Sequence, residues 1–449
     1  MTKKIFIIMC MLTFNYSLAS TVAVIDSGVD VRHADLAPFI WINDLEFNGR
    51  SNRDEDGNGY QDDIYGWNFA ENNNQVIDYK YLGTFSNDVY IFFDYQQRYL
   101  LGTATNEEIQ WMRDKVREPE FLKEIQMFGN FIHGTHVSGI VLNQSVGTKV
   151  LAVKLIPTKV GLSVAEKNIR GKKGGIDTVR KTLDALARTQ MTTMTEISTY
   201  IASHGATVAN GSFGTGYEQS KMITQIIFKA IMWRSPSEEE LKDVTISFLN
   251  SLINHGQGMV AEASDTLFVF AAGNDGTCND EFPTSPASLN AINTMSVAAT
   301  FGREEIAVFS NYGIKTVDVA APGVGINSTI PGDEWMKFSG TSQAAPYVAK
   351  IAGQIETINP ALKPNDVKKI IMMTVDKKDF LKGLVKTSGI VNFDRAVMAA
   401  ELVKNMSMEE AINESKVRVA DVVSESIGKS KNYKDYYNFV QPLPSGFSF

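Results

Sequence analysis

The chain has 449 residues and a formal net charge of −8, with 44% hydrophobic and 21% charged residues. These fractions are those of a soluble globular protein, and the length suits one large catalytic domain or two ordinary ones. The mild acidity argues against nucleic acid as the main partner. Beyond the first residues, no segment is long and apolar enough to be a transmembrane helix.

The N-terminus has the pattern of an export signal. Two lysines precede an apolar run over residues 5–12, which is too short to span a bilayer, and Ser17-Leu18-Ala19 offers small residues at the two positions that a signal peptidase reads. We therefore predict that residues 1–19 are removed and that the protein is secreted, to the exterior or the periplasm. The alternative is a buried N-terminal strand or helix. Cys278 is then the only cysteine of the mature chain, which excludes an intramolecular disulfide.

Short apolar runs then alternate with helical stretches. We expect strands at residues 21–25, 150–153, 206–210, 267–271, 295–299 and 317–320. We expect helices over 134–142, in the second part of 160–200 after a Lys-rich connection, over 341–358 and within 401–425. This alternation predicts a three-layer α/β fold, with a mostly parallel central sheet and helices on both faces.

Two stretches depart from the alternation. Residues 41–130 are rich in Asn, Asp, Gly and aromatics, with one or two charged amphipathic helices over 105–127, and we interpret them as a large surface insertion. Residues 429–449 are polar and aromatic and are predicted to be a loose tail. The predicted organisation is a main domain over 20–400, which contains the insertion, and a C-terminal extension over 401–449.

Three polar segments carry the groups that peptide-bond hydrolysis needs. Ser342 stands at an expected strand-to-helix junction in Gly340-Thr341-Ser342-Gln343-Ala344-Ala345-Pro346, where the positive end of a helix favours negative charge. His133, in His133-Gly134-Thr135-His136, offers an imidazole suited to accept and return a proton. Asp26, in Asp26-Ser27-Gly28, offers a carboxylate that can hold the imidazole in one tautomer.

These segments resemble the three active-site signatures of the subtilases, the subtilisin-like serine proteases, in the chain order Asp, His, Ser. The resemblance implies a subtilisin-like fold and a serine endopeptidase that works through an acyl-enzyme, with Asp26, His133 and Ser342 as the triad. It also implies that Asn274, in Ala271-Ala272-Gly273-Asn274, is the side-chain donor to the oxyanion, joined by the backbone N–H of Ser342.

Residues 210–214, Asn-Gly-Ser-Phe-Gly, look like the subtilase strand that pairs with substrate. The substrate-binding positions implied by the resemblance are Ser212, Phe213, Gly214, Ala271, Ala272 and Gly273. We expect a monomer that acts on polypeptides. The competing interpretation is a catalytically silent subtilase fold used as a binding module, with the insertion as its interaction surface. An intact triad and Asn274 argue against it, since a silent site has no chemical need for them.

An acidic loop is a candidate metal site. Its oxygen-bearing residues fall at alternate positions and follow the first half of an EF-hand calcium loop, but the twelfth position is Tyr65 rather than Glu. The candidate ligands are Asp54, Asp56, Asn58, Tyr60 (through its carbonyl), Asp62 and Asp63. Similar loops followed by Gly-Trp-Asn-Phe, here residues 66–69, occur in larger subtilases, so the resemblance favours a structural Ca²⁺. The alternative for the loop is a solvated acidic turn without a metal. A calcium-dependent structural protein is an alternative for the whole chain, but that interpretation accounts for this loop only.

Restraint of the activity is an open question in this sequence. Asp26 lies a few residues after the expected cleavage point, so we expect no N-terminal propeptide, although most exported subtilases carry one. The 41–130 insertion and the 401–449 extension are candidates for covering the cleft. Among the other histidines, we expect His136 to support the His133 loop from behind and His204 to be an ordinary surface or helix-end residue.

Overall fold

The computed structural model describes residues 19–159, 173–423 and 439–445, so the predicted signal and the Lys-rich connection lie almost wholly outside the described residues. The strands are β1 (Ser20–Asp26), β2 (Gly66–Asn68), β3 (Thr148–Lys154), β4 (Val208–Gly211), β5 (Leu267–Ala271), β6 (Thr294–Phe301), β7 (Glu305–Ile306), β8 (Val319–Pro322), β9 (Ile326–Ile330), β10 (Glu334–Phe338), β11 (Asp376–Lys377) and β12 (Gly389–Ile390). The helices are α1 (Asp44–Phe47), α2 (Asn87–Leu100), α3 (Asn106–Lys115), α4 (Pro119–Leu142), α6 (Ile176–Ser203), α7 (Tyr217–Met232), α8 (Glu238–Glu262), α9 (Thr341–Ile358), α10 (Pro364–Met373), α11 (Phe393–Leu402) and α12 (Met408–Arg418).

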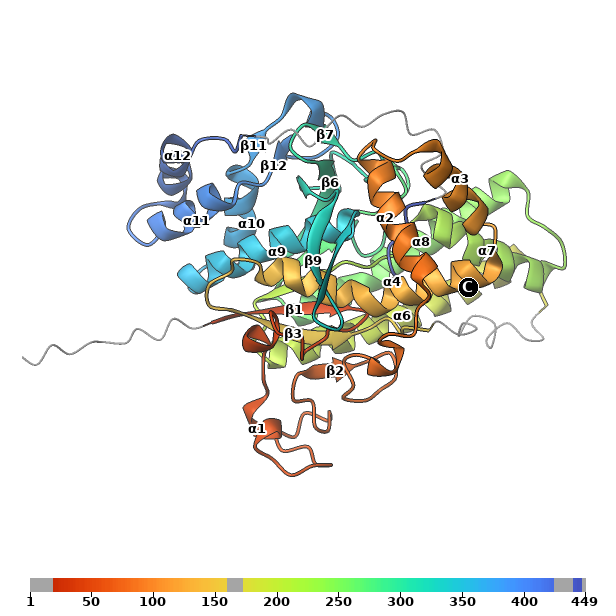
Figure 1. Ribbon diagram of the computed structural model, residues 1–449, viewed down its shortest axis with the longest axis horizontal. Helices are drawn as coiled ribbons and strands as arrows, with labels where there is room; N and C mark the ends of the chain where they lie inside the picture. The colour runs from red at the N-terminus through yellow and green to blue at the C-terminus, as the bar shows by residue number, and fades with distance from the viewer. Residues whose placement is uncertain (1–18, 160–172, 424–438, 446–449) are drawn as a thin grey trace, which may run out of the picture.

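One central sheet organises the described residues (Figure 1). Its strand order is β11-β12-β8-β6-β5-β4-β1-β3-β2, with β7 paired to β6, and its pairings are parallel except for β11–β12 and β6–β7. Because neighbouring parallel strands end at the same edge, the residues that follow β1, β4 and β5 lie together there. The separate β9–β10 pair is an antiparallel hairpin.

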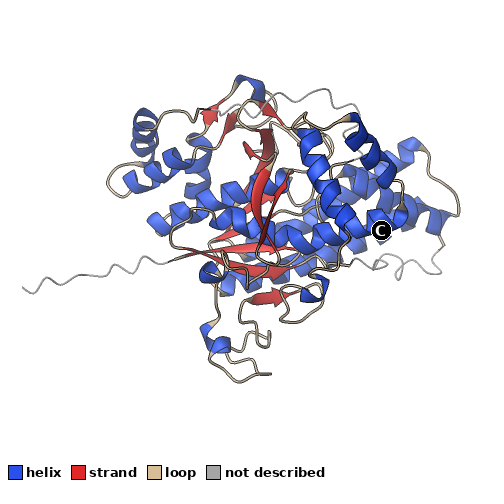
Figure 2. Ribbon diagram, viewed as in Figure 1, coloured by secondary structure: helices blue, strands red, loops and turns tan. Residues whose placement is uncertain are grey.

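The two faces of the sheet are covered by different helices, as the alternation of side chains along β1 requires. Val22 and Val24 belong to the apolar cluster that includes residues of α4, α9 and α10, whereas Ala23 and Ile25 belong to the cluster that includes residues of α6, α7 and α8. Figure 2 shows the strands between these helices. The predicted α/β architecture is confirmed. No helix among residues 19–159, 173–423 and 439–445 has the length and apolarity to cross a membrane.

The 41–130 stretch contributes buried residues to a hydrophobic core and does not lie only on the surface. Its helices α2 and α3 and the first half of α4 bury a cluster of mainly aromatic side chains against the β9–β10 hairpin, here called the aromatic cluster. Its buried members are Ile77, Val89, Phe92, Phe93, Met112, Phe121, Ile125, Phe128, Phe131, Ile132, Ile330 and Phe439. Aromatic rings of this size bury enough apolar area to form a core of their own.

Two local predictions were wrong. The helix expected to open beside His133 begins at Pro119, so His133 lies in the middle of α4 rather than in a loop. A proline at the first helical turn, where no intrahelical N–H bond is lost, explains the earlier start. The second error concerns the tail, because residues 439–445 are packed against the main domain: Phe439 is 1% exposed and Leu443 is 5% exposed.

Candidate active site

Asp26 and His133 come together across the end of the sheet. Asp26 is the last residue of β1 and is fully buried, and its Oδ1 lies 2.7 Å from Nδ1 of His133. The same oxygen accepts a hydrogen bond from the backbone N–H of Ser27 at 2.7 Å, which fixes the carboxylate. When Asp26 accepts a hydrogen bond from Nδ1–H of His133, Nε2 is the ring nitrogen that can take a proton in the cleft.

The absence of a side chain at residue 134 permits this contact. A Cβ on Gly134 would lie 2.2 Å from the carbonyl oxygen of Gly28 and 3.1 Å from Cβ of Asp26. Real Cβ atoms essentially never lie within 3.0 Å of such an atom, so a side chain at residue 134 would require α4 or the Gly28 backbone to shift. The glycine next to His133 therefore permits the close approach of α4 to the end of β1.

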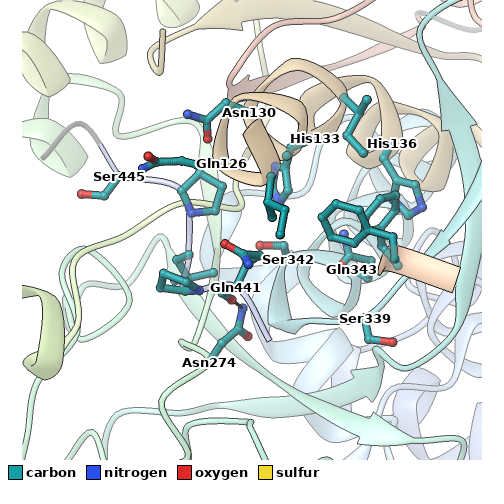
Figure 3. Close-up of a pocket in the computed structure, with 18 of the residues that line it drawn as sticks. Gln126, Asn130, His133, His136, Asn274, Ser339, Ser342, Gln343, Gln441 and Ser445 are labelled. Atoms are coloured by element: carbon teal, nitrogen blue, oxygen red, sulfur yellow. Dashed lines mark hydrogen bonds between the residues drawn. The ribbon is translucent and has the colours of Figure 1, made fainter. Parts of the chain in front are cut away.

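Ser342 lies in the first turn of α9, in the same cleft as His133 (Figure 3). Its Oγ donates to the carbonyl oxygen of Ser212 at 3.1 Å, and Oγ of Ser212 donates back to the Ser342 carbonyl at 3.0 Å. Within the described residues no hydrogen bond joins Ser342 to His133.

Asn274 presents its amide N–H₂ to the cleft. Its Oδ1 accepts from the backbone N–H and the hydroxyl of Thr341, at 2.9 and 2.8 Å. These two donors determine which end of the amide is the oxygen, so Nδ2 is turned outward. There it lies 3.3 Å from the carbonyl oxygen of Gln441. An N–H aimed at a peptide carbonyl beside a serine hydroxyl is the arrangement that stabilises an oxyanion.

His136, one turn beyond His133, is a structural neighbour. Its Nε2 lies 3.0 Å from the carbonyl oxygen of Met336 and 3.2 Å from that of Ile326, so the ring connects α4 to both strands of the β9–β10 hairpin. Burial lowers the pKa of His136 to about 3, with a contribution from nearby His133, although the carbonyl contacts oppose the shift. The ring of His136 therefore stays neutral.

The predicted substrate-binding residues take different places. Gly214 donates its N–H to the carbonyl oxygen of Pro444 at 2.9 Å, so a peptide already pairs with this backbone. Phe213 turns its side chain into the apolar cluster under the sheet, and Ala271 and Ala272 are fully buried at the end of β5. A Cβ on Gly273 would meet Nδ2 of Asn311 at 2.2 Å, so this glycine permits a close approach of two chain segments.

The acidic loop gathers some of its predicted ligands and not others. Asp56 and Asp63 face one another, with amide hydrogens of Asn43 and Asn58 bonded to both at 2.8–3.1 Å. Nε2 of His204 lies 3.5 Å from Asp63 and its side chain is 7% exposed. The expected helix-end position is confirmed, because His204 caps the C-terminus of α6, but the expected surface exposure is wrong. Burial raises the pKa of the Asp63 carboxyl, although hydrogen bonds from Tyr200 and Asn58 and the charge of His204 oppose the shift.

Asp54 lies beside Asp56, since carboxylate oxygens of Glu46, Asp54 and Asp56 all lie within 4.8 Å of one another, and both Asp54 and Asp62 also stabilise the loop. Asp54 accepts backbone N–H bonds from Gly57, Asn58 and Gly59 at 2.7–3.1 Å, and Asp62 accepts one from Asn52 at 2.8 Å. The hydroxyl of Tyr60 is directed to Glu196 at 3.0 Å. Asn43 and His204 were not among the predicted ligands because neither stands in the loop, and only the fold brings His204 there from the end of α6.

Comparison with known proteins identifies the family to which the chain is similar. A model described as the subtilase family matches residues 19–393. The chain is 26% identical over 387 residues to subtilisin-like protease 1 of Plasmodium falciparum (isolate 3D7), covering 85% of this chain and 44% of that protein. It is 44% identical over 101 residues to alkaline elastase YaB of Bacillus sp. (strain YaB), covering 22% of this chain and 25% of that protein. The chain thus spans less than half the length of these two relatives. A crystal structure of a cold adapted subtilisin-like serine proteinase aligns with 84% of this chain and 88% of that one, at 18% identity and a TM-score of 0.43.

Proposed function

Because the chain belongs to the subtilase family, we propose that it is a serine endopeptidase that hydrolyses polypeptides with Asp26, His133 and Ser342. The observation that carries the proposal is the 2.7 Å contact between Asp26 and His133 in the cleft that also contains the Ser342 hydroxyl and the Asn274 amide. A nucleophile, a base, a group that orients the base and an oxyanion donor are the parts that acyl transfer requires.

The proposed reaction uses each of these groups once. The Ser342 hydroxyl turns from Ser212 to Nε2 of His133, which takes its proton as Oγ attacks a substrate carbonyl carbon. Asp26 stabilises the imidazolium, and Nδ2 of Asn274 with the Ser342 N–H binds the oxyanion. His133 then gives the proton to the leaving amine. Water, deprotonated by His133, attacks the ester and releases the acid and the Ser342 hydroxyl.

The test combines labelling with hydrolysis. A fluorophosphonate probe should modify wild-type protein at Ser342 and leave Ser342→Ala unmodified, while the same change lowers kcat on casein by about 10⁶, the size known for subtilisin. A silent binding module would react with the probe in neither form. Equal hydrolysis by the two proteins would contradict the assignment of Ser342.

We also propose that the protein is exported and that cleavage falls after Ala19. Ser20 begins β1 directly and donates its N–H to the carbonyl oxygen of Gly147 at 3.0 Å, so removal of residues 1–19 leaves the sheet complete. N-terminal sequencing of protein recovered from the medium or the periplasm should begin at Ser20. Recovery only from the cytoplasm with the first residues intact would contradict export.

For the acidic loop we propose a structural Ca²⁺ held by Asp56 and Asp63. The two carboxylates converge beside His204, whose charge depends on protonation. Carboxylate oxygens are the ligands that Ca²⁺ prefers, and the amide oxygens of Asn43 or Asn58 could complete the set if these amides turned. When bound, the ion would neutralise the carboxylates and stabilise the folded state by linkage.

A further inference from the structure

The cleft contains a peptide that belongs to the chain itself. The segment Phe439–Ser445, here called the 439–445 segment, has the sequence Phe-Val-Gln-Pro-Leu-Pro-Ser, and its last five residues line the same cleft as His133, Asn274 and Ser342. Figure 3 shows Gln441 next to Asn274 and Ser342, with Ser445 farther along the cleft. A substrate peptide would need the same space.

The segment is bound at its centre by the catalytic groups. The carbonyl oxygen of Gln441 accepts from Nδ2 of Asn274 at 3.3 Å, the contact proposed for an oxyanion. The next bond joins Gln441 to Pro442, so the amine that would leave is a proline ring nitrogen. The Ser342 hydroxyl is directed to Ser212 and does not meet His133 within the described residues. The peptide is therefore bound while the nucleophile is out of line.

Both ends of the segment are anchored by side chains. At one end Phe439 enters the aromatic cluster, with its ring centroid 5.1 Å from that of Tyr99, and Gln96 donates to its carbonyl oxygen. Because both of these residues belong to α2, the 41–130 insertion supplies a binding pocket for an aromatic side chain of a peptide. The residues that form this pocket are not among the proposed catalytic groups Asp26, His133, Ser342 and Asn274.

The other end is held by backbone and hydroxyl contacts. Leu443 is 5% exposed and belongs to the main apolar cluster, and Gly214 donates to the carbonyl oxygen of Pro444 at 2.9 Å. The hydroxyls of Ser445 and Thr215 lie 3.0 Å apart. Two prolines in seven residues restrict the free segment, which lowers the entropy lost on binding.

We propose that the 439–445 segment is an intramolecular inhibitor that occupies the peptide-binding cleft, with Phe439 and Leu443 as its anchors, and that the cleft admits substrate only when the segment leaves. This inference rests on the proposed endopeptidase function. Since substrate binds only the open fraction of molecules, the apparent KM is raised by the reciprocal of that fraction, whereas kcat at saturation is unchanged.

The first experiment weakens both anchors in the full chain. Phe439→Ala/Leu443→Ala should lower KM for a short fluorogenic peptide at least about tenfold, leave kcat unchanged and speed fluorophosphonate labelling of Ser342 by the same factor. The matched control is Val423→Ala, since Val423 is also apolar but is 88% exposed. If the double variant and the control are labelled and hydrolyse the peptide at wild-type rates, the inhibitor proposal is overturned. The endopeptidase proposal stands in that case, because all three proteins are active. If none of them labels or hydrolyses, the endopeptidase proposal fails.

A second experiment does not depend on the double variant folding. Thr215→Cys/Ser445→Cys, in a Cys278→Ser background, should form a disulfide across the 3.0 Å hydroxyl contact and hold the segment in the cleft. The oxidised protein should label at least about tenfold more slowly than the same protein after reduction. Equal rates in the oxidised and reduced forms, with the crosslink verified by mass spectrometry, would overturn the proposal.

A synthetic peptide provides the third readout. The peptide of residues 439–445 should inhibit Phe439→Ala/Leu443→Ala competitively, and a scrambled peptide of the same composition should not. Because a tethered segment acts at an effective concentration in the millimolar range, the free peptide is tested up to about 5 mM. Equal inhibition by the two peptides would show that the cleft does not recognise this sequence, which contradicts the proposal.

Discussion

The side-chain oxygen of Asn274 accepts two hydrogen bonds from Thr341, one from the backbone N–H at 2.9 Å and one from the hydroxyl at 2.8 Å. Thr341 precedes the proposed nucleophile Ser342, so the residue that starts α9 also orients the proposed oxyanion donor. This coupling fixes the N–H₂ group toward the cleft without any contribution from substrate. Such preorganisation is the largest single contribution to many acyl-transfer rates.

Substitutions of Asn274 and Thr341 should therefore both lower kcat, with the larger loss at Asn274. Asn274→Ala is expected to lower kcat by about 10²–10³ with little change in KM, because the donor acts on the transition state. Asn274→Asp keeps the shape but removes the N–H₂, and should lose at least as much. Thr341→Val removes one of the two orienting bonds and should cost about tenfold in kcat. These constants are measured in the Phe439→Ala/Leu443→Ala background, and a change confined to KM would contradict the oxyanion role.

Asp26→Asn tests the group that orients the base. An amide can donate to Nδ1 of His133 and so favours the tautomer with its proton on Nε2, which cannot accept from Ser342. We expect kcat to fall by about 10⁴, the size known for such triads, with the fold retained. Steady-state kinetics with circular dichroism checks this, and a variant that keeps a tenth of the wild-type kcat would exclude the proposed role.

Gly134 and Gly129 form a matched pair on α4. Gly134→Ala should lower the free energy of unfolding by about 1–3 kcal/mol, because its Cβ would meet the Gly28 carbonyl at 2.2 Å. Gly129→Ala meets nothing within 4 Å and should raise it by about 0.5–1 kcal/mol through helix propensity. Urea unfolding measures both, and equal effects of the two substitutions would contradict the close approach at Gly134.

Glu356 on α9 makes stability depend on pH. Burial raises the pKa of this carboxyl to about 7, although the charge of Lys363 opposes the shift. The folded state therefore holds the proton more tightly than the unfolded chain, and stability falls as pH rises from about 4.5 to about 7. The ionised group costs on the order of 3 kcal/mol above that range.

Glu356→Gln should remove this cost. At pH 8 the variant is expected to be more stable than wild type by up to about 3 kcal/mol, and at pH 4 the two should agree within about 0.5 kcal/mol. Denaturant unfolding at both pH values gives the comparison. A variant that is less stable than wild type at pH 8 would show that the ionised carboxylate is well compensated.

Calcium should act through stability. Adding CaCl₂ after EDTA treatment should raise Tm of the wild type by several degrees, since an ion that binds only the folded state stabilises it in proportion to the logarithm of its concentration. Asp63→Asn should abolish the rise, because it removes one of the two converging charges. Asp265→Asn is the control, since this carboxylate is 81% exposed and remote in sequence from the loop. A Tm that EDTA and CaCl₂ leave unchanged contradicts the site.

Several elements followed from local sequence. Apolar runs predicted β1, β3, β4, β5, β6 and β8, because strands buried on both faces are continuous in apolar residues. The start of α4 at Pro119 was not predicted. The first part of this helix is charged and the second part is apolar, so the sequence suggested two separate helices rather than one continuous helix. His204 gave no signal, since one histidine near a glycine has no spacing relation to an acidic loop in another part of the chain.

The sequence by itself determined the family and the sheet and led to the proposed reacting groups, because short motifs fix which functional groups are present and apolar periodicity fixes the layers. Only the tertiary structure decided where Phe439 and Gln441 lie and which way the Ser342 hydroxyl points. Those positions depend on contacts between residues 130 to 343 positions apart in the sequence. For Phe439, burial of the aromatic ring in a pocket formed by α2 outweighs the polar composition that predicted a loose tail.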